Sequence, residues 1–128
     1  MVEAQNAAFG PNTRGGQNYL VAVDGSEASE LAFTLAMHGL FRPGLDNFHV
    51  CTITNSKKEG LPFQYRPDYI EDKYQAKIWR NAQSGEARFL KKEVEEGKST
   101  KEQLWKVAQD CHSNVIVTGM HGRKGPKA

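Results

Sequence analysis

Cysteine is scarce in this chain, with only Cys51 and Cys111 among 128 residues. Two cysteines are too few for a disulfide framework, and neither belongs to a CxxC pair that could hold a metal or a redox couple. Cys51 lies inside an apolar run, so we interpret it as a buried thiol. This cysteine usage favours a reducing, cytoplasmic setting.

Long apolar runs are missing as well. No stretch approaches the ~20 apolar residues that a membrane-spanning helix needs. The opening segment, MVEAQNAAFG, has neither the basic nor the apolar region of a secretory signal. The sequence therefore predicts no membrane partner and no secretion.

The familiar catalytic and metal-binding signatures do not occur either. The chain contains no GxxxxGK[ST], GxGxxG, HExxH or GxSxG pattern. Its histidines, His38, His49, His112 and His121, are dispersed and have no ligand spacing. We therefore predict no catalytic residues and no metal ligands. Enzyme activity, such as slow ATP hydrolysis, is a weaker alternative.

What the chain does contain is enough for a core. Hydrophobic residues make up 38% and charged residues 25%, at a net charge of +2, which is typical of one globular domain. The last eleven residues hold Arg123, Lys124 and Lys127 and no acid. Such a basic end could bind phosphates or simply be solvated. No aromatic residues cluster beside it, so we expect no nucleic-acid partner.

Strand-like and helix-like segments alternate along the chain. Residues 1–18 are rich in turn residues without apolar periodicity and predict a disordered tail, followed by a domain over residues 19–128. Buried strands are expected at 19–23, 48–53 and 114–118, and helices after Ser26, from Asp68 and after Ser99. The segment 88–94 could end a helix or form a charged edge strand. We favour the strand, because Gly85 precedes it and Gly97 follows.

This alternation predicts an α/β fold with an open, mostly parallel, Rossmann-like sheet and helices on both faces. Ser26 is expected to cap the first helix, and Ser99 with Glu102 forms a capping box for the last. The residues expected to face the core are Ala28, Leu31, Ala32, Leu35 and Ala36, then Tyr69, Ile70, Tyr74, Ile78 and Trp79, and finally Leu104, Trp105, Val107, Ala108 and Cys111.

Ligands of open parallel sheets bind beyond the carboxyl ends of the strands, where the strand order reverses. Asp24 follows the first strand, and its carboxylate could accept hydrogen bonds from ribose hydroxyls or an adenine amino group, or could serve only as a turn or capping residue. The last strand runs into Gly119-Met-His-Gly122-Arg-Lys-Gly125. These glycines and cations could approach a phosphate, or form a solvated turn.

With these residues in view, the chain resembles the universal stress protein family. The resemblance is carried by YLVAVDGSEAS at 19–29, HVCTI at 49–53 and NVIVTGMHGRKG at 114–125. It implies a parallel α/β sheet of five strands, often dimeric, in which ATP-binding members hold the nucleotide between the first and fourth strand ends.

Position by position, the resemblance implies a binding site for ATP or AMP, with Mg²⁺ as a companion of the phosphates. It places Ala22, Val23 and Asp24 beside adenine and ribose, and Ile53 against the adenine. The loop beside ribose and phosphates holds Thr118, Gly119, Met120, His121, Gly122 and Arg123.

The sequence departs from the family pattern at its end. ATP-binding members continue with a G-[ST] pair, whereas here only six residues follow Gly122. We therefore expect that the last helix and the last strand, which commonly forms the homodimer edge, are missing from this chain. Two functions remain open: a stress-response module that binds adenine nucleotide, and a scaffold of the same fold that acts through dimer or partner contacts.

Overall fold

A computed structural model describes residues 8–55, 60–82 and 85–119. Its strands are β1 (Asn18–Ala22), β2 (Asn47–Thr54), β3 (Ala87–Glu93) and β4 (Val115–Thr118). Its helices are α2 (Glu27–Leu35), continued by the π-helical turn η1 (Ala36–Leu40), the 3₁₀ turn η2 (Phe63–Tyr65), α3 (Pro67–Asn81) and α4 (Thr100–Asp110). None of the described helices is long and apolar enough to span a membrane.

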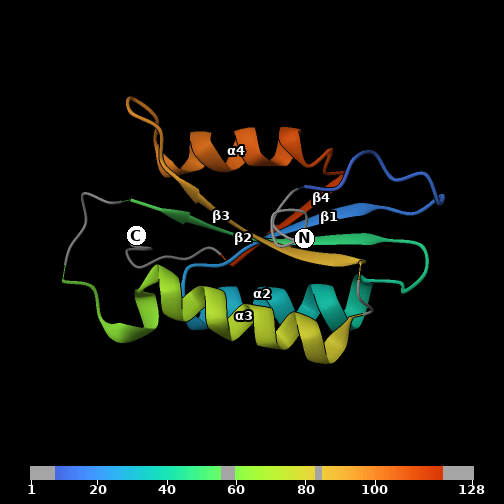
Figure 1. Cartoon of the computed structure of the whole chain (residues 1–128), viewed down its shortest axis with the longest axis horizontal. Helices are drawn as coiled ribbons and strands as arrows, with labels where there is room; N and C mark the ends of the chain where they lie inside the picture. Colours follow the sequence, from blue (N-terminus) through green and yellow to red (C-terminus); the bar gives the residue numbers. More distant parts are fainter. Residues whose placement is uncertain (1–7, 56–59, 83–84, 120–128) are drawn as a thin grey trace.

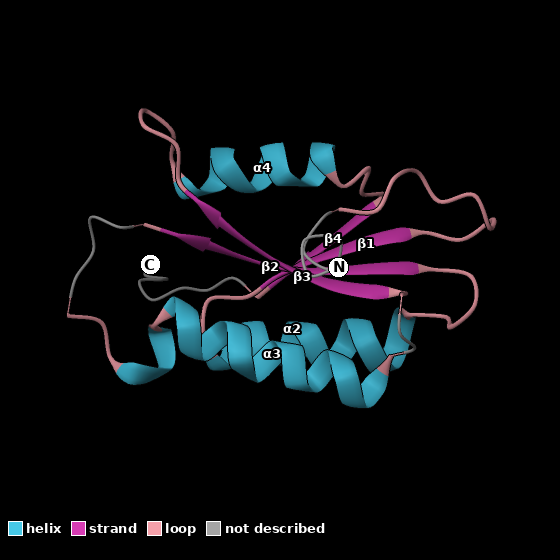
Figure 2. Ribbon diagram, in the orientation of Figure 1, coloured by secondary structure: helices cyan, strands magenta, loops and turns pink. Residues whose placement is uncertain are grey.

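The four strands form one parallel sheet in the order β3-β2-β1-β4. Helices α2 and α3 cover one face and α4 covers the other (Figures 1 and 2). The chain adds β2 and β3 on one side of β1 and then crosses to add β4 on the other. The predicted open parallel α/β sheet is confirmed, and its strand order reverses between β1 and β4.

Each face of the sheet has its own apolar core. On the α2 and α3 face, Val21, Val50 and Phe89 lie in register on neighbouring strands and are fully or almost fully buried. On the α4 face, Leu20, Cys51, Leu90, Val107, Ala108 and Cys111 form a second cluster. Burial of this apolar surface on both faces stabilises the sheet.

The core face of α2 is confirmed at Ala32 and Ala36 but is shifted by one residue from the predicted stripe. Leu31 and Leu35 are 70% and 59% exposed, whereas Ala32, Phe33, Ala36 and Met37 are buried. One residue of shift corresponds to a rotation of about 100° around the helix axis. Phe33 sets this rotation, because its ring packs edge-on against Phe48 at 5.8 Å and against Tyr74 at 5.2 Å.

Both tryptophans were expected in the core and lie outside it. Trp79 is 82% exposed and Trp105 is 61% exposed. In α3 the buried residues Ile70, Tyr74 and Ile78 repeat every four positions, so that Trp79 falls on the neighbouring face. Helix α4 buries Gln103, Val107 and Ala108, and Trp105 again lies off that stripe.

Two other predictions are confirmed. The ambiguous segment around residues 88–94 is strand β3, at the edge of the sheet. Ser99 and Glu102 form the reciprocal capping box at the start of α4, and Ser26 caps α2 by accepting a hydrogen bond from Ser29 N at 3.1 Å.

Residues 8–17 differ from the expected disordered tail, because they pack on the sheet. The Phe9 amide donates to His49 Nε2 at 3.0 Å, and the Arg88 guanidinium lies 4.0 Å from the centre of the Phe9 ring. Arg14 binds Glu86 at 3.2 Å and the Asn47 side-chain oxygen at 2.6 Å. The segment is ordered because it supplies partners to polar groups that the strands bury at their amino ends.

Candidate functional site

The predicted site residues converge at the carboxyl edge of the sheet. Asp24 follows β1, Ile53 lies near the end of β2, Thr118 ends β4 and Gly119 follows it. Met120, His121, Gly122 and Arg123 lie outside the described residues. Within the described part, the structure therefore brings the first half of the predicted site to one edge, at the point where the strand order reverses.

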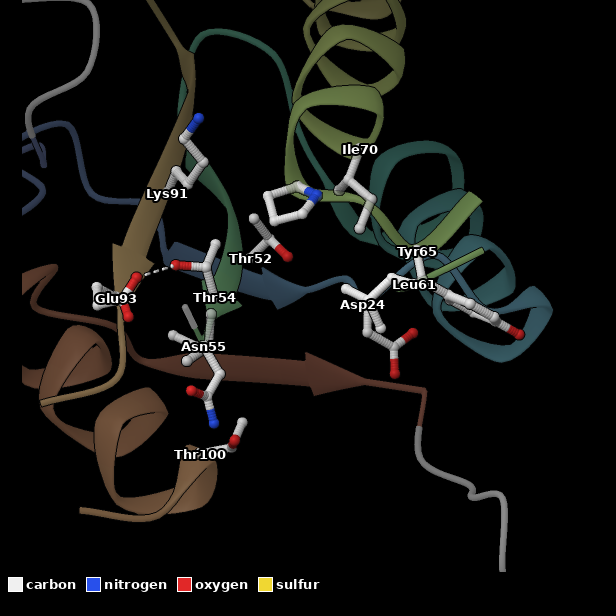
Figure 3. A pocket seen from close by; sticks show the side chains of 12 residues that line it. Asp24, Thr52, Thr54, Asn55, Leu61, Tyr65, Ile70, Lys91, Glu93 and Thr100 are labelled. Carbon is white, nitrogen blue, oxygen red and sulfur yellow. Dashed lines mark hydrogen bonds between the residues drawn. The ribbon is translucent and has the colours of Figure 1, made fainter. Parts of the chain in front are cut away.

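A cavity of about 600 Å³ opens at this edge, between the strand ends and the connection from β2 to α3 (Figure 3). Its walls are mainly polar on the strand side and apolar on the helix side. The lining comprises Asp24, Thr52, Ile53, Thr54, Asn55, Leu61, Tyr65, Pro67, Ile70, Lys91, Glu93 and Thr100. A cavity of this size accommodates a small organic ligand.

Asp24 has one carboxylate oxygen engaged and one open. Oδ1 accepts hydrogen bonds from the Ser26 amide at 2.9 Å and the Ser26 hydroxyl at 2.6 Å. Oδ2 makes no hydrogen bond within the described part of the chain, and the residue is exposed. Asp24 is therefore a turn residue through Oδ1, and Oδ2 remains available as an acceptor at the cavity mouth.

Ser29 links this turn to the helix that follows. Its hydroxyl is buried, accepts from the Asp24 amide at 3.2 Å and donates to the Ser26 carbonyl at 3.1 Å. These bonds fix the backbone on both sides of Asp24. The orientation of the carboxylate is therefore set before any ligand arrives.

Gly119 brings the end of β4 against the first turn of α2. A Cβ at this position would overlap the Ala28 carbonyl oxygen, so that only glycine allows the approach. The exit of β4 thus passes directly beside the turn that carries Asp24. This close passage is the part of the predicted Gly119 loop that the structure describes.

A second, larger cavity is lined by all six described residues of the predicted site: Ala22, Val23, Asp24, Ile53, Thr118 and Gly119. It has a volume of about 1630 Å³ and lies on the α4 face, although the Val23 side chain itself is buried in the core under α2 and α3. The second cavity is mostly apolar, with Leu104, Trp105 and Ile116 among its walls. It shares Asp24, Ile53, Tyr65 and Thr100 with the first, so that the two cavities meet at the predicted site.

Several lining residues were not predicted from the sequence. Leu61 and Tyr65 come from the connection between β2 and α3, and Thr100 directly follows the N-cap residue Ser99. Lys91 lies in the wall, but Glu71 and Asp68 hold its ammonium group at 2.9 and 3.3 Å. The hydrogen bond to Glu71 is the main cause that raises the pKa of Lys91, so this cation is already paired.

The described residues contain no group of three metal-ligating side chains. His38 and His112 are exposed and His49 is buried against Phe9. His121 lies outside the described residues. The described site therefore offers hydrogen-bond acceptors, hydroxyls and apolar walls.

Comparison with known proteins agrees with this architecture. The family model of the universal stress protein family matches residues 17–128. A crystal structure of a protein from the universal stress protein family of Burkholderia pseudomallei superposes with a TM-score of 0.53 at 21% identity, over 87% of this chain and 86% of that one. No curated protein matches the chain.

At that identity the crystal structure supports the fold alone. The family match extends over the strand ends that carry Asp24, Ile53 and Gly119, and the parallel sheet agrees with it. The chain belongs to the universal stress protein family.

Proposed function

We propose that this stress-response module binds an adenine nucleotide, ATP or AMP, at the carboxyl ends of β1 and β4. The observation that carries the proposal is the open Oδ2 of Asp24 at the mouth of the cavity of about 600 Å³. A preoriented carboxylate at the point of strand-order reversal suits ribose hydroxyls or an adenine amino group.

The cavity has both apolar and polar walls, a combination that suits a nucleotide. Ile53, Leu61 and Ile70 provide apolar surface for a base, and Thr52, Thr54 and Asn55 provide hydroxyl and amide groups. The phosphates would extend toward Gly119 and the loop that follows it. Any Mg²⁺ would be bound with them.

Substitution of Asp24 tests the proposal. Asp24→Asn keeps an oxygen that can accept from Ser26 and removes the charge from the cavity mouth. We expect ATP and AMP binding, measured by calorimetry, to weaken by about tenfold or more, because hydrogen bonds to charged groups contribute roughly 1.5–3 kcal/mol. Asp72→Asn, on the exposed side of α3, should bind like the wild type. No binding to the wild type at millimolar nucleotide would refute the proposal.

A second candidate function is a scaffold that acts through a homodimer or a protein partner without nucleotide. It is favoured by β4, which has no neighbour on its outer side among the described strands, and by Trp105 and Ile116, which are exposed close to it. Strand edges of this kind are templates for pairing. Size exclusion would show a dimer whose population does not change when ATP is added.

A further inference from the structure

Tyr65 lines both cavities, as does Asp24; Figure 3 shows the two residues at the rim of the smaller one. It is 38% exposed, and its hydroxyl makes no hydrogen bond within the described part of the chain. The ring takes part in no aromatic or cation contact there either. An aromatic side chain in this position adds little to the core, and its ring is accessible from the cavities.

The turn that carries Tyr65 is held by its own contacts. The Tyr65 amide donates to the Pro62 carbonyl at 2.9 Å, and the Arg66 side chain donates through Nε to the Leu61 carbonyl at 3.0 Å. The Phe63 ring lies 4.3 Å from the ring of Tyr69 in α3. Phe63 therefore contacts α3, whereas Tyr65 lines the rim of both cavities beside Asp24.

Gly25 allows this turn to lie on the turn between β1 and α2. A Cβ at Gly25 would overlap the Gln64 carbonyl oxygen and would lie 3.0 Å from Tyr65 Cδ1. Gly25 also has a φ of +90°, which favours glycine. The Cδ1 edge of the Tyr65 ring thus lies close to the Gly25 main chain, next to Asp24.

We propose that Tyr65 is a ligand-contacting residue whose ring stacks on the base of the bound nucleotide while Asp24 binds the ligand by hydrogen bonds. The proposal rests on the nucleotide-binding function proposed above and names a further ligand-contacting residue of that site. A flat, partly exposed aromatic ring offers a planar base dispersion and stacking contacts, which are strong and do not depend on which base is bound. Stacking involves the Tyr65 ring alone, so the Tyr65 hydroxyl is not required for this role.

The test uses AMP as the probe and the variants Tyr65→Ala and Tyr65→Phe. Stacking predicts that Tyr65→Ala weakens AMP binding by about tenfold and that Tyr65→Phe binds as the wild type does. It also predicts an upfield ring-current shift of the adenine H2 and H8 proton resonances on binding, present with the wild type and Tyr65→Phe and lost with Tyr65→Ala. Trp79→Ala removes an aromatic ring that lines neither cavity and should change neither measurement.

The outcomes separate this inference from the proposed function. If the wild type binds AMP and Tyr65→Ala binds it equally well with the same proton shifts, the stacking role is refuted and the nucleotide site stands. Loss of binding in Tyr65→Phe would also refute stacking, because the ring is retained in that variant. If the wild type shows no AMP binding, both proposals are refuted.

Discussion

At the scale of single residues, His49 shows how a buried polar side chain is held: its Nε2 has a hydrogen-bond partner, whereas its Nδ1 has none among the described residues. Its side chain is fully buried on the α4 face of β2, where Nε2 accepts a hydrogen bond from the Phe9 amide at 3.0 Å. Only the neutral imidazole can accept in this way. Burial lowers the pKa of His49 from 6.5 to about 4, and the nearby Arg88 guanidinium acts in the same direction.

Mild acid is therefore expected to destabilise the fold. The unfolded chain takes up a proton at His49 as the pH falls below 6.5, whereas the folded chain resists protonation until about pH 4. Stability is fully present above pH 6.5 and is lost progressively toward pH 4. The loss at pH 5 should be about 2 kcal/mol.

Urea unfolding at pH 7 and pH 5 measures this effect. His49→Gln keeps an acceptor without titrating, so its stability should vary less between the two pH values. His38→Gln, at an exposed position, should keep the full wild-type dependence. An equal pH dependence in the wild type and His49→Gln would contradict the role given to His49.

At the scale of elements, the sequence pattern predicts poorly which side of each helix faces the sheet. Apolar residues occur on more than one side of α2, α3 and α4, so that several stripes compete for the sheet. In each helix the stripe that packs is the one whose side chains fit the opposite surface, as Phe33 fits between Phe48 and Tyr74. Large exposed residues such as Trp79 and Leu31 remain on the other sides.

Adjacent positions in α3 provide a direct test of that rotation. Ile78→Ala should lower the free energy of unfolding by about 2–5 kcal/mol, because it removes a buried side chain. Trp79→Gln, one residue later, should change it by no more than about 0.5 kcal/mol, because the indole is exposed. Thermal or urea denaturation of both variants gives the comparison. An effect at Trp79 as large as that at Ile78 would mean that both side chains face the core, as the sequence pattern alone suggests.

At the scale of the whole molecule, residues 8–17 join segments that are distant in the chain. Arg14 reaches Glu86, whose side chain is 10% exposed, and the Gly44 amide donates to the same carboxylate oxygen at 2.6 Å. Asp46, fully buried nearby, is held by Arg42 at 2.9 Å and by the Gln17 amide at 2.8 Å. The amino edge of the sheet is thereby tied together by charge-assisted hydrogen bonds, while the carboxyl edge is left open for the candidate site.

Removal of Arg14 should loosen this edge. Arg14→Ala leaves the Glu86 carboxylate with one cationic partner fewer, and we expect a loss of about 1–3 kcal/mol in the free energy of unfolding. Arg80→Ala, an exposed cation at the end of α3, should have little effect. In the background of Glu86→Gln the cost of Arg14→Ala should fall, since the charge that Arg14 compensates is gone. An unchanged cost in that double-mutant cycle would rule out the ion pair as the source.

Local chemistry was enough to locate most elements and the strand ends that carry the candidate site. The apolar runs of β1 and β2, the caps at Ser26 and Ser99, and Asp24 and Gly119 beside strand ends are all legible in short stretches, because turns, caps and buried strands depend on neighbouring residues. The alternation of strands and helices then implied a parallel sheet and, with it, the edge at which ligands bind.

The remaining features depend on contacts between residues far apart in the chain. Phe9 binds His49 forty positions away, and Arg14 binds Glu86 seventy-two positions away. Tyr65 becomes part of the site only because Gly25 lets its turn lie beside Asp24. No short-range pattern encodes such contacts. They arise when the sheet, once assembled, presents buried polar groups and open surfaces that distant side chains are able to satisfy.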